Sequence, residues 1–381
     1  MAAETHTCRQ EPTDVLRIGD ALSRPVYGRP DGASARVLLL AAGQRIESEL
    51  QLRRLREAGF AVQLPSEERS PNDPALPPAD PSPPAASAMF TQRLEAGQRL
   101  RQTVIEAAGD ITRRVASGAA PDIPNLLSAS SVLAAEVAAD PYAVATVAHL
   151  QQCDDYTVEH SADVAILTVA IAHLLGRGAT DLRLLALAGL LHDVGKQRVP
   201  KEILDKPGPL TPEELKEVRR HPQHGFDILT HCEDCAPEAR LVALQHHECP
   251  DGSGYPAGCA RSVLHPYSLI AAVADTFDAM TADRVYHKGI PARPALLQLH
   301  AARETHFDAA AVAALIKLVG VYPVGTRVVL NTGERAVVIA PNPEDTTRPV
   351  VQVDQDHLGR ALARSFTLFL QGASCCIVAA Q

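Results

Sequence analysis

Hydrophobic and polar positions change their spacing along the chain, and the changes predict different kinds of structure. Between residues 88 and 320, apolar residues recur at helical intervals, as in TQRLEAGQRLRQTVIEAAGDITRRVA. We expect helices over 125–138, 142–152, 157–175, 181–193, 212–220, 222–230, 236–247, 267–282, 292–302 and 308–319. From Tyr322 onward the pattern is that of strands, and TRVVLNTGERAVVIAP is typical of a hairpin that turns at 331–333. The predicted fold class is mainly α, a helical bundle with a small α/β N-terminal unit and a small β C-terminal appendage.

Proline marks the boundary between the first two parts of the chain. Residues 65–87 contain eight prolines, a density that opposes helix and sheet hydrogen bonding, so we expect an extended linker. Before it, residues 13–64 combine two strand patterns, a turn at 31–32 and an amphipathic helix over 48–60. No catalytic spacing occurs there, and we interpret 13–64 as a regulatory unit. The remaining predicted parts are a connecting helix over 88–121, a helical domain over 122–321 and the β appendage over 322–381.

Composition and charge narrow the classes of partner. The chain has 381 residues, is 46% hydrophobic and carries a formal net charge of -9. An acidic balance opposes a broad basic face for DNA, so an anionic ligand needs a locally positive site. The start MAAETHTCRQ lacks the pattern of a signal peptide, and the apolar stretches are shorter than the roughly 18 residues of a membrane span. We therefore expect a cytoplasmic protein without a membrane or DNA partner.

Histidine and aspartate residues provide the candidate chemistry. In HDVGK, His192 and Asp193 close a very apolar segment, where an ionised carboxylate needs a compensating positive charge. A divalent metal ion supplies that charge, and imidazole with carboxylate suits first-row metals. The other candidates on predicted helices or helix ends are His160, His221, His224, His246, His247, Asp275 and Asp278. Helices of a bundle can direct such side chains to one centre, so the pattern predicts a metal site.

Four motifs together resemble the HD-GYP family, a branch of the HD-domain metal-dependent phosphohydrolases. They are HDVGK, HPQHG, HHECPDGSGYP and DTFDAMTADRVY, within about residues 125–320. The resemblance implies a helical HD domain that hydrolyses the bacterial messenger cyclic di-GMP to linear pGpG, sometimes onward to GMP. The metal ligands that it implies are His160, His192, Asp193, His221, His246, His247 and Asp275, with Asp193 bridging two ions. Members with a third ion have a glutamate where Tyr156 stands here, so we expect two divalent ions, iron or manganese.

The resemblance also implies residues that act on the substrate. Lys196 is expected to contact a phosphate or to protonate the leaving oxygen, and the alternative is a surface lysine at a helix end. Arg284 is expected to clamp a phosphate. The family usually has a basic residue where His287 stands, and we expect Lys288 to replace it. The loop residues expected near the guanine base are Asp251, Gly254, Tyr255 and Pro256.

Three functions remain open at this level. The first is an active cyclic di-GMP phosphodiesterase with Asp193 and Lys196 as catalytic residues. The second is a receptor that binds cyclic di-GMP with little or no cleavage, and the third is another HD-type nucleotide phosphohydrolase. The apolar side of the helix over 91–116 is able to pair with a second copy, which predicts a homodimer. A regulatory N-terminal unit also predicts protein signalling partners.

Overall fold

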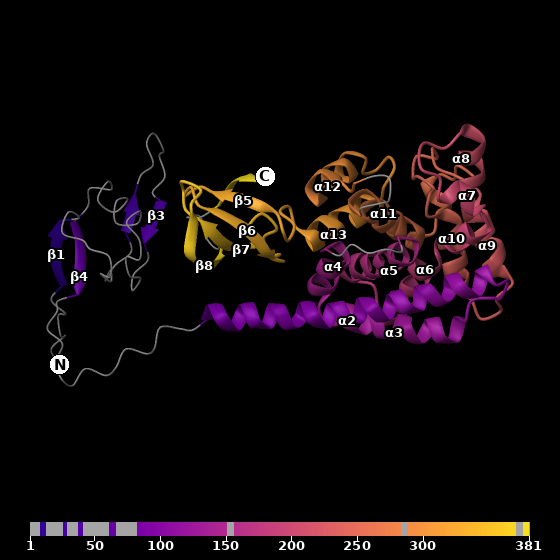
Figure 1. The fold of residues 1–381 in the computed structure, drawn as a ribbon, viewed down its shortest axis with the longest axis horizontal. Helices are drawn as coiled ribbons and strands as arrows, with labels where there is room; N and C mark the ends of the chain where they lie inside the picture. Colours follow the sequence, from indigo (N-terminus) through magenta and orange to yellow (C-terminus); the bar gives the residue numbers. More distant parts are fainter. Residues whose placement is uncertain are drawn as a thin grey trace. The chain divides into compact units, whose positions relative to one another are not determined.

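The computed structural model of this chain describes residues 8–12, 26–28, 37–40, 61–65, 82–150, 156–282, 288–370 and 376–380 (Figure 1). Side chains are described from residue 94 onward, apart from 149–156 and 363–364 within those ranges. Arg284 and the predicted helix over 48–60 therefore lie outside the described residues. The contacts divide the chain into two units, and each is described by itself.

The N-terminal residues form two pairs of strands. β1 (Cys8–Pro12) pairs antiparallel with β4 (Ala61–Pro65), and β2 (Val26–Gly28) pairs antiparallel with β3 (Val37–Leu40). The turn expected at 31–32 falls between β2 and β3 but outside the described residues. β2 and β3 agree with the two strand patterns on either side of the expected turn, whereas β1 and β4 were not predicted and β1 lies before the expected unit of residues 13–64.

The helices of the second unit form a bundle around α5 (Figure 1). They are α2 (Ser82–Ala116), α3 (Ile123–Ala139), α4 (Pro141–Leu150), α5 (Tyr156–Leu174), α6 (Ala179–Leu191), α7 (Lys201–Leu204), α8 (Pro212–Val218), α9 (His221–Thr230), α10 (Pro237–Gln245), α11 (Pro266–Thr281), α12 (Ala292–Ala301) and α13 (Ala309–Val319). Two short 3₁₀ helices, η2 (Val194–Arg198) and η3 (Arg261–Val263), follow α6 and α10. The mainly α fold class and the helices predicted after residue 88 are confirmed, although α7, η2 and η3 were not predicted.

Helix α5 is central because it is mostly apolar and is buried on every side after its first turn. It packs against α3, α4, α6, α11 and α13, and its residues from 160 to 172 are all buried. A helix that is hydrophobic all round belongs in a protein core or a membrane. Among the described helices, none by itself meets the length and apolarity of a membrane span; α3 and the first part of α4 meet them only as a pair bent by 117°.

Helix α2 begins and ends earlier than expected, since it ends at Ala116 and the helix predicted from sequence spans 88–121. It begins at Ser82, so residues 82–87, which we expected in the linker, belong to the helix. Pro83 and Pro84 fit there because the first N–H groups of a helix have no partner within the helix.

In the middle of α2, Leu100, Val104 and Ile111 are buried in the core of their own domain. The apolar stripe is therefore covered by this chain at these positions, and the homodimer stays a prediction.

The C-terminal strands form one five-stranded sheet in the order β8-β7-β6-β5-β9. The strands are β5 (Arg327–Leu330), β6 (Arg335–Ala340), β7 (Val350–Gln355), β8 (Ala361–Phe369) and β9 (Ile377–Ala380). β5 and β6 pair antiparallel on either side of the predicted turn. Alternate residues such as Val328, Leu330, Ala336 and Val338 are buried, which gives the sheet one apolar face.

Candidate metal centre

Seven side chains from different parts of the bundle converge. His160 comes from α5, His192 and Asp193 from the end of α6, His221 from the start of α9, His246 and His247 from the end of α10, and Asp275 from α11. They form two groups whose potential ligand atoms lie within 4.8 Å of one another: Asp193 with His221, His246 and His247, and His160 with His192 and Asp275. The structure thus brings together all the residues that the resemblance implied as metal ligands.

The carboxylate of Asp193 joins the two groups. Its Oδ1 lies 3.2 Å from Nε2 of His221 and 3.7 Å from Nε2 of His246. Its Oδ2 lies 3.3 Å from Nε2 of His192 and 3.5 Å from Nε2 of His160. Each oxygen therefore faces a different set of imidazoles, as a carboxylate does when it bridges two ions.

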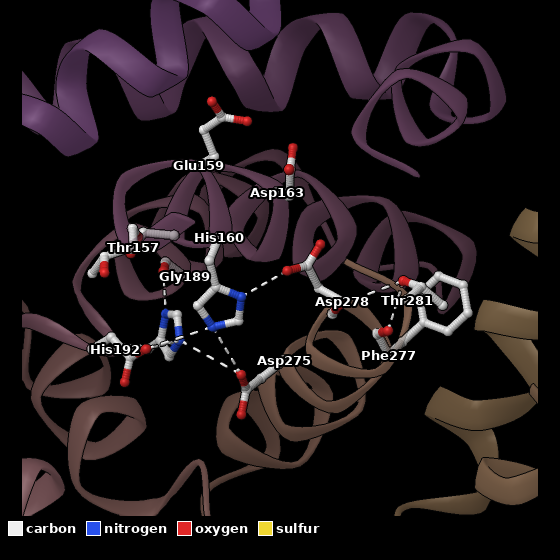
Figure 2. Close-up of polar contacts among 12 residues, drawn as sticks. Thr157, Glu159, His160, Asp163, Gly189, His192, Asp275, Phe277, Asp278 and Thr281 are labelled. Carbon is white, nitrogen blue, oxygen red and sulfur yellow. Dashed lines mark hydrogen bonds and ion pairs between the residues drawn. The ribbon is translucent and has the colours of Figure 1, made fainter. Parts of the chain in front are cut away.

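Asp275 also reaches both groups, from the side of α11 (Figure 2). Its Oδ1 lies 3.1 Å from Nε2 of His160 and 3.9 Å from Nε2 of His192. Its Oδ2 lies 3.7 Å from Nδ1 of His247. Two carboxylates thus lie among five imidazoles.

Three of the imidazoles are oriented by backbone carbonyls. Nδ1 lies near the carbonyl oxygen of Gly189 for His192 (2.7 Å), Val218 for His221 (2.8 Å) and Val242 for His246 (3.1 Å). A carbonyl oxygen only accepts hydrogen bonds, so Nδ1 carries the proton and donates. The lone pair of Nε2 is then directed at the centre. This is the usual tautomer of a histidine that binds metal through Nε2.

His160 is oriented by a carboxylate instead. Its Nδ1 lies 2.7 Å from Oδ2 of Asp278, one turn after Asp275 on α11 (Figure 2). The pair holds Nε2 of His160 toward Asp193 and Asp275. Asp278, one of the candidate residues from sequence, therefore orders a ligand.

Lone pairs face one another throughout the centre. Nε2 of His221 lies 3.2 Å from Nε2 of His246 as well as 3.2 Å from Asp193 Oδ1. Nε2 of His192 and Oδ1 of Asp193 are buried and have no hydrogen-bond partner among the described residues. Buried acceptors without partners are costly, and cations between them remove that cost. The donor set therefore fits divalent metal ions.

The protonation states also suit metal binding. Burial lowers the pKa of His221 to about 3 and lowers the pKa of His247, so both are neutral at pH 7. Burial disfavours the ionised form of Asp193 and Asp275. Nevertheless, the Lys196 ammonium beside Asp193 holds the pKa of that carboxyl below its usual value. Neutral imidazole and ionised carboxylate are the forms that coordinate metal.

Two glycines let the backbone bring Asp193 and His221 together. A Cβ on Gly195 would lie 2.0 Å from the carbonyl oxygen of His221 and 2.3 Å from the nitrogen of Gly225. Only glycine allows η2 to approach the start of α9 this closely. The predicted helix over 181–193 accordingly ends at Leu191, and the chain turns after Asp193. The packing role of Gly195 was not predicted, although Gly195 is the fourth residue of the motif HDVGK.

The loop after His247 is shaped by Glu248. This carboxylate is buried and accepts hydrogen bonds from the backbone nitrogens of Ala257 (2.7 Å), Gly258 (3.2 Å) and Cys259 (2.8 Å). A Cβ on Gly254 would lie 2.5 Å from Cα of Glu248. Gly254 thus permits a close backbone contact inside the loop.

Other predicted loop residues lie at the surface. The Asp251 carboxylate is exposed and accepts from the nitrogen (2.9 Å) and hydroxyl (2.6 Å) of Ser253. Its Oδ2 also lies 3.7 Å from His306. Pro256 is exposed. The described contacts of Asp251 therefore stabilise the turn, and its contact with substrate stays a prediction.

Tyr255 lies against the ligand group. Its ring centroid is 4.7 Å from that of His247, with the planes 24° apart. The guanidinium of Arg219 lies 5.2 Å from the centre of the same ring, an arrangement that favours a cation–π contact. Burial raises the pKa of Tyr255, so its phenol is neutral. Arg219 precedes HPQHG by two residues, and sequence reasoning did not select it.

The predicted basic residues have different positions. Nζ of Lys196 contacts Oδ2 of Asp193, and the lysine side chain is 23% exposed. Lys196 is therefore beside the centre, between Asp193 and solvent. Lys288 is exposed. Arg284 lies outside the described residues, so its role stays a prediction.

Comparison with known proteins agrees with this geometry. A family model described as HD domain matches residues 147–311, which include all seven ligands. The chain is 35% identical over 323 residues to a Pseudomonas aeruginosa protein named cyclic di-GMP phosphodiesterase PA4108, with 82% of this chain and 77% of the relative covered. Fold, site and matched domain define an HD-domain phosphohydrolase. Within that class, the chain belongs to the HD-GYP family.

Two further relatives match over the HD domain. One is the response regulator RpfG of Xanthomonas campestris, named a cyclic di-GMP phosphodiesterase, with 38% identity over 39% of this chain and 39% of the relative. The other is a Vibrio cholerae protein named 3'3'-cGAMP-specific phosphodiesterase 3, with 37% identity over 44% of this chain and 36% of the relative. Both cyclic dinucleotides therefore occur as substrates in the names of its relatives.

Proposed function

We propose that this chain hydrolyses cyclic di-GMP to linear pGpG, with further cleavage to GMP as a slower step. The observation that carries the proposal is the Asp193 carboxylate, whose two oxygens face two separate groups of imidazole lone pairs. The name of the Pseudomonas aeruginosa relative supports the choice of substrate. A receptor without turnover has no need of this complete set of ligands.

The ligand residues would hold two divalent ions, iron or manganese, which when bound supply an activated water and positive charge for the phosphoryl oxygens. Asp193 would bridge the ions. His160, His192 and Asp275 would complete one site, and His221, His246 and His247 would complete the other. The fixed Nδ1 contacts of four imidazoles hold these atoms in place before substrate binds.

Residues around the centre would bind and orient the substrate. Lys196 is beside Asp193 and partly exposed, so its ammonium is able to contact a phosphate or to protonate the leaving oxygen. Tyr255 stacks on His247 and Arg219 lies over the same ring, so these two side chains would line the position of a guanine base. Gly254 and Glu248 keep this loop in shape. Contacts from Asp251, Pro256, Arg284 and Lys288 remain part of the proposal.

The parts outside the HD domain would regulate or assemble the enzyme. We propose that residues 13–64 form a regulatory unit with protein signalling partners and that residues 322–381 form an accessory β unit. A homodimer, if it forms, must use a surface other than the buried stripe of α2. The cytoplasmic location stays the expectation from sequence.

The test is turnover by protein purified without oxygen and loaded with Fe(II) or Mn(II). We expect cyclic di-GMP to be converted to pGpG, with 3'3'-cGAMP and mononucleotides cut more slowly. Asp193→Asn should lose both bound metal and turnover. Asp205→Asn should keep both, because Asp205 is exposed and pairs with the exposed Lys201. Tight binding of uncut cyclic di-GMP would instead indicate a receptor, and faster cleavage of 3'3'-cGAMP would reassign the substrate.

A further inference from the structure

A second buried polar cluster lies next to the metal centre, and its cation comes from α2. Arg101 is 3% exposed and is the one lysine or arginine classed as fully buried where side chains are described. Its Nε donates to Oδ1 of Asp163 (2.6 Å), and its Nη2 donates to Oδ2 of Asp163 (2.6 Å) and to Glu159 (2.8 Å). A buried guanidinium needs such partners, and its planar fork fits two carboxylates at once.

Both carboxylates belong to the helix that provides the first metal ligand. Glu159 and Asp163 are one residue before and three residues after His160 on α5, and Figure 2 shows them on the other side of His160 from Asp275. Burial raises the pKa of Asp163 to about 7 although Arg101 bonds it, and the charge of Asp278 adds to that rise. Asp163 lies one turn after His160 on α5, and Asp278 bonds the ring of that histidine, so both carboxylates lie next to His160.

These contacts form a continuous series from α2 to the metal ligands. Arg101 bonds Asp163, which lies one turn after His160 on α5. Asp278 bonds Nδ1 of His160, and Nε2 of His160 faces Asp275 at 3.1 Å. Without the guanidinium, the carboxylates of Glu159 and Asp163 would lie on either side of His160 along α5 with no cation bonded to them. Like charges repel strongly in a buried environment.

The backbone of α2 is fixed close to its neighbours on both sides of Arg101. A Cβ on Gly97 would lie 3.0 Å from Cγ2 of Val147 on α4, and one on Gly109 would lie 3.7 Å from Cγ1 of Val158 on α5. Leu100 and Val104, next to Arg101 on the helix, are buried in the core. The position of the guanidinium therefore follows the position of α2.

We propose that Arg101 is a positioning residue for the metal centre. By bridging Glu159 and Asp163 it offsets the negative charge behind His160 and keeps Asp278 aligned on Nδ1, so that Nε2 is directed at the metals. The proposal rests on the metal-dependent function given above.

The experiment measures Mn(II) affinity of the full-length protein by competition with a chelating dye. Arg101→Met should raise the Kd for Mn(II) by about tenfold or more, the usual effect of losing a group that supports a ligand. Arg101→Lys should give a smaller rise, because an ammonium cannot span both carboxylates as the fork does. Arg99→Met is the matched control, since Arg99 is exposed on the same helix and should leave the Kd unchanged.

Charge rescue separates positioning from a general effect on packing. Arg101→Met with Asp163→Asn should recover most of the lost affinity, because no unpaired charge then faces Asp278. At saturating Mn(II), kcat of Arg101→Met should return toward wild type while KM stays unchanged. A folded Arg101→Met protein with wild-type Mn(II) affinity would overturn the proposal.

Two other outcomes are equally decisive. If Arg101→Met does not fold, Arg101→Lys decides, and wild-type affinity in that variant would contradict the proposal. If the wild-type protein binds no Mn(II) or Fe(II), the proposed function itself fails. If wild type binds metal and the arginine variants bind it equally well, the function stands and only the role of Arg101 is refuted.

Discussion

Two buried polar clusters meet at α5, and they differ in whether their polar atoms have hydrogen-bond partners. Around Arg101, Glu159 and Asp163, each charged group has a partner of opposite sign within 2.8 Å. Around Asp193, the lone pairs of carboxylates and imidazoles face one another, and two buried atoms have no hydrogen-bond partner among the described residues. Both clusters contain one cation for two carboxylates, because Lys196 contacts Asp193. Only around Arg101 does each charged group also have its hydrogen-bond partners, and we call that cluster balanced and the one around Asp193 unbalanced.

The difference separates structural from functional polar groups. A buried network that satisfies all its members fixes the packing of helices, here of α2 on α5. A buried network whose acceptors face each other is suited to bind a positively charged ligand. The second kind costs stability until the ligand binds, which is common at functional sites.

The largest effect is expected from changing Asp193, the carboxylate that the two ligand groups of the unbalanced cluster share. Asp193→Asn replaces one carboxylate oxygen with an amide nitrogen that cannot coordinate, so one group loses its shared ligand. We expect turnover of cyclic di-GMP to fall by at least about 10³-fold, equivalent to about 4 kcal/mol of lost transition-state stabilisation. Steady-state kinetics and metal analysis of the same sample measure this, with Asp205→Asn as the control. Full activity in Asp193→Asn would place the reaction elsewhere.

Breaking the balanced cluster should mainly affect stability. Arg101→Met leaves two carboxylates buried without their cation, and removal of one partner of a buried ion pair typically costs about 3–5 kcal/mol. Urea unfolding without added metal measures the change in the free energy of unfolding. Adding Asp163→Asn should recover part of the loss because it removes the unpaired charge. If Arg101→Met unfolds at the same urea concentration as Arg99→Met, the cluster does not stabilise the packing of α2.

Metal removal should lower the stability of the folded protein, because the acceptors of the site cluster then lose their cations. Ions that bind only the folded protein stabilise it by about 2.7 kcal/mol when their concentration is 100 times Kd. We therefore expect a chelator to lower the melting temperature of the wild-type protein and to leave that of Asp193→Asn nearly unchanged. Differential scanning fluorimetry with and without Mn(II) measures both. Equal shifts in the two proteins would show that the metal binds outside this centre.

A smaller effect is expected from the group that connects the clusters. Asp278→Asn keeps the size of the side chain but weakens its hydrogen bond to Nδ1 of His160. Loss of such a supporting contact typically lowers metal affinity by about 10- to 100-fold. Mn(II) titration measures the affinity, and the folded state should persist by circular dichroism. Unchanged affinity would show that His160 is held in place by packing alone.

The smallest effect is expected in the loop, where the polar groups are satisfied locally. Glu248→Gln removes an acceptor charge from three backbone N–H groups, with a typical cost of about 1–3 kcal/mol. We expect KM for cyclic di-GMP to rise while the metal content stays at the wild-type level. A loss of metal would mean that Glu248 supports the ligands and not only the loop.

Much of this structure was predictable because its signals are local. Helical spacing predicted the helices from α3 to α13 to within a few residues, apart from the four-residue α7. The histidine and aspartate motifs selected the residues that converge, since each ligand lies on a recognisable helix or helix end. The turn at 331–333 was predicted from asparagine and glycine between two strand patterns. The beginning of α2 was not, because proline density was weighted above the tolerance of a first helical turn for proline.

The sequence by itself determined which helices form and which side chains are able to bind metal, because periodicity and residue chemistry are properties of short segments. Tertiary structure alone decided that the stripe of α2 is covered by its own domain and that Arg101 reaches Asp163, 62 positions further along the chain. It also decided that Gly195 lets η2 touch α9, and that the two oxygens of Asp193 face different imidazoles. These facts depend on contacts between distant segments, and such contacts are set by packing of the whole bundle, which no local pattern encodes.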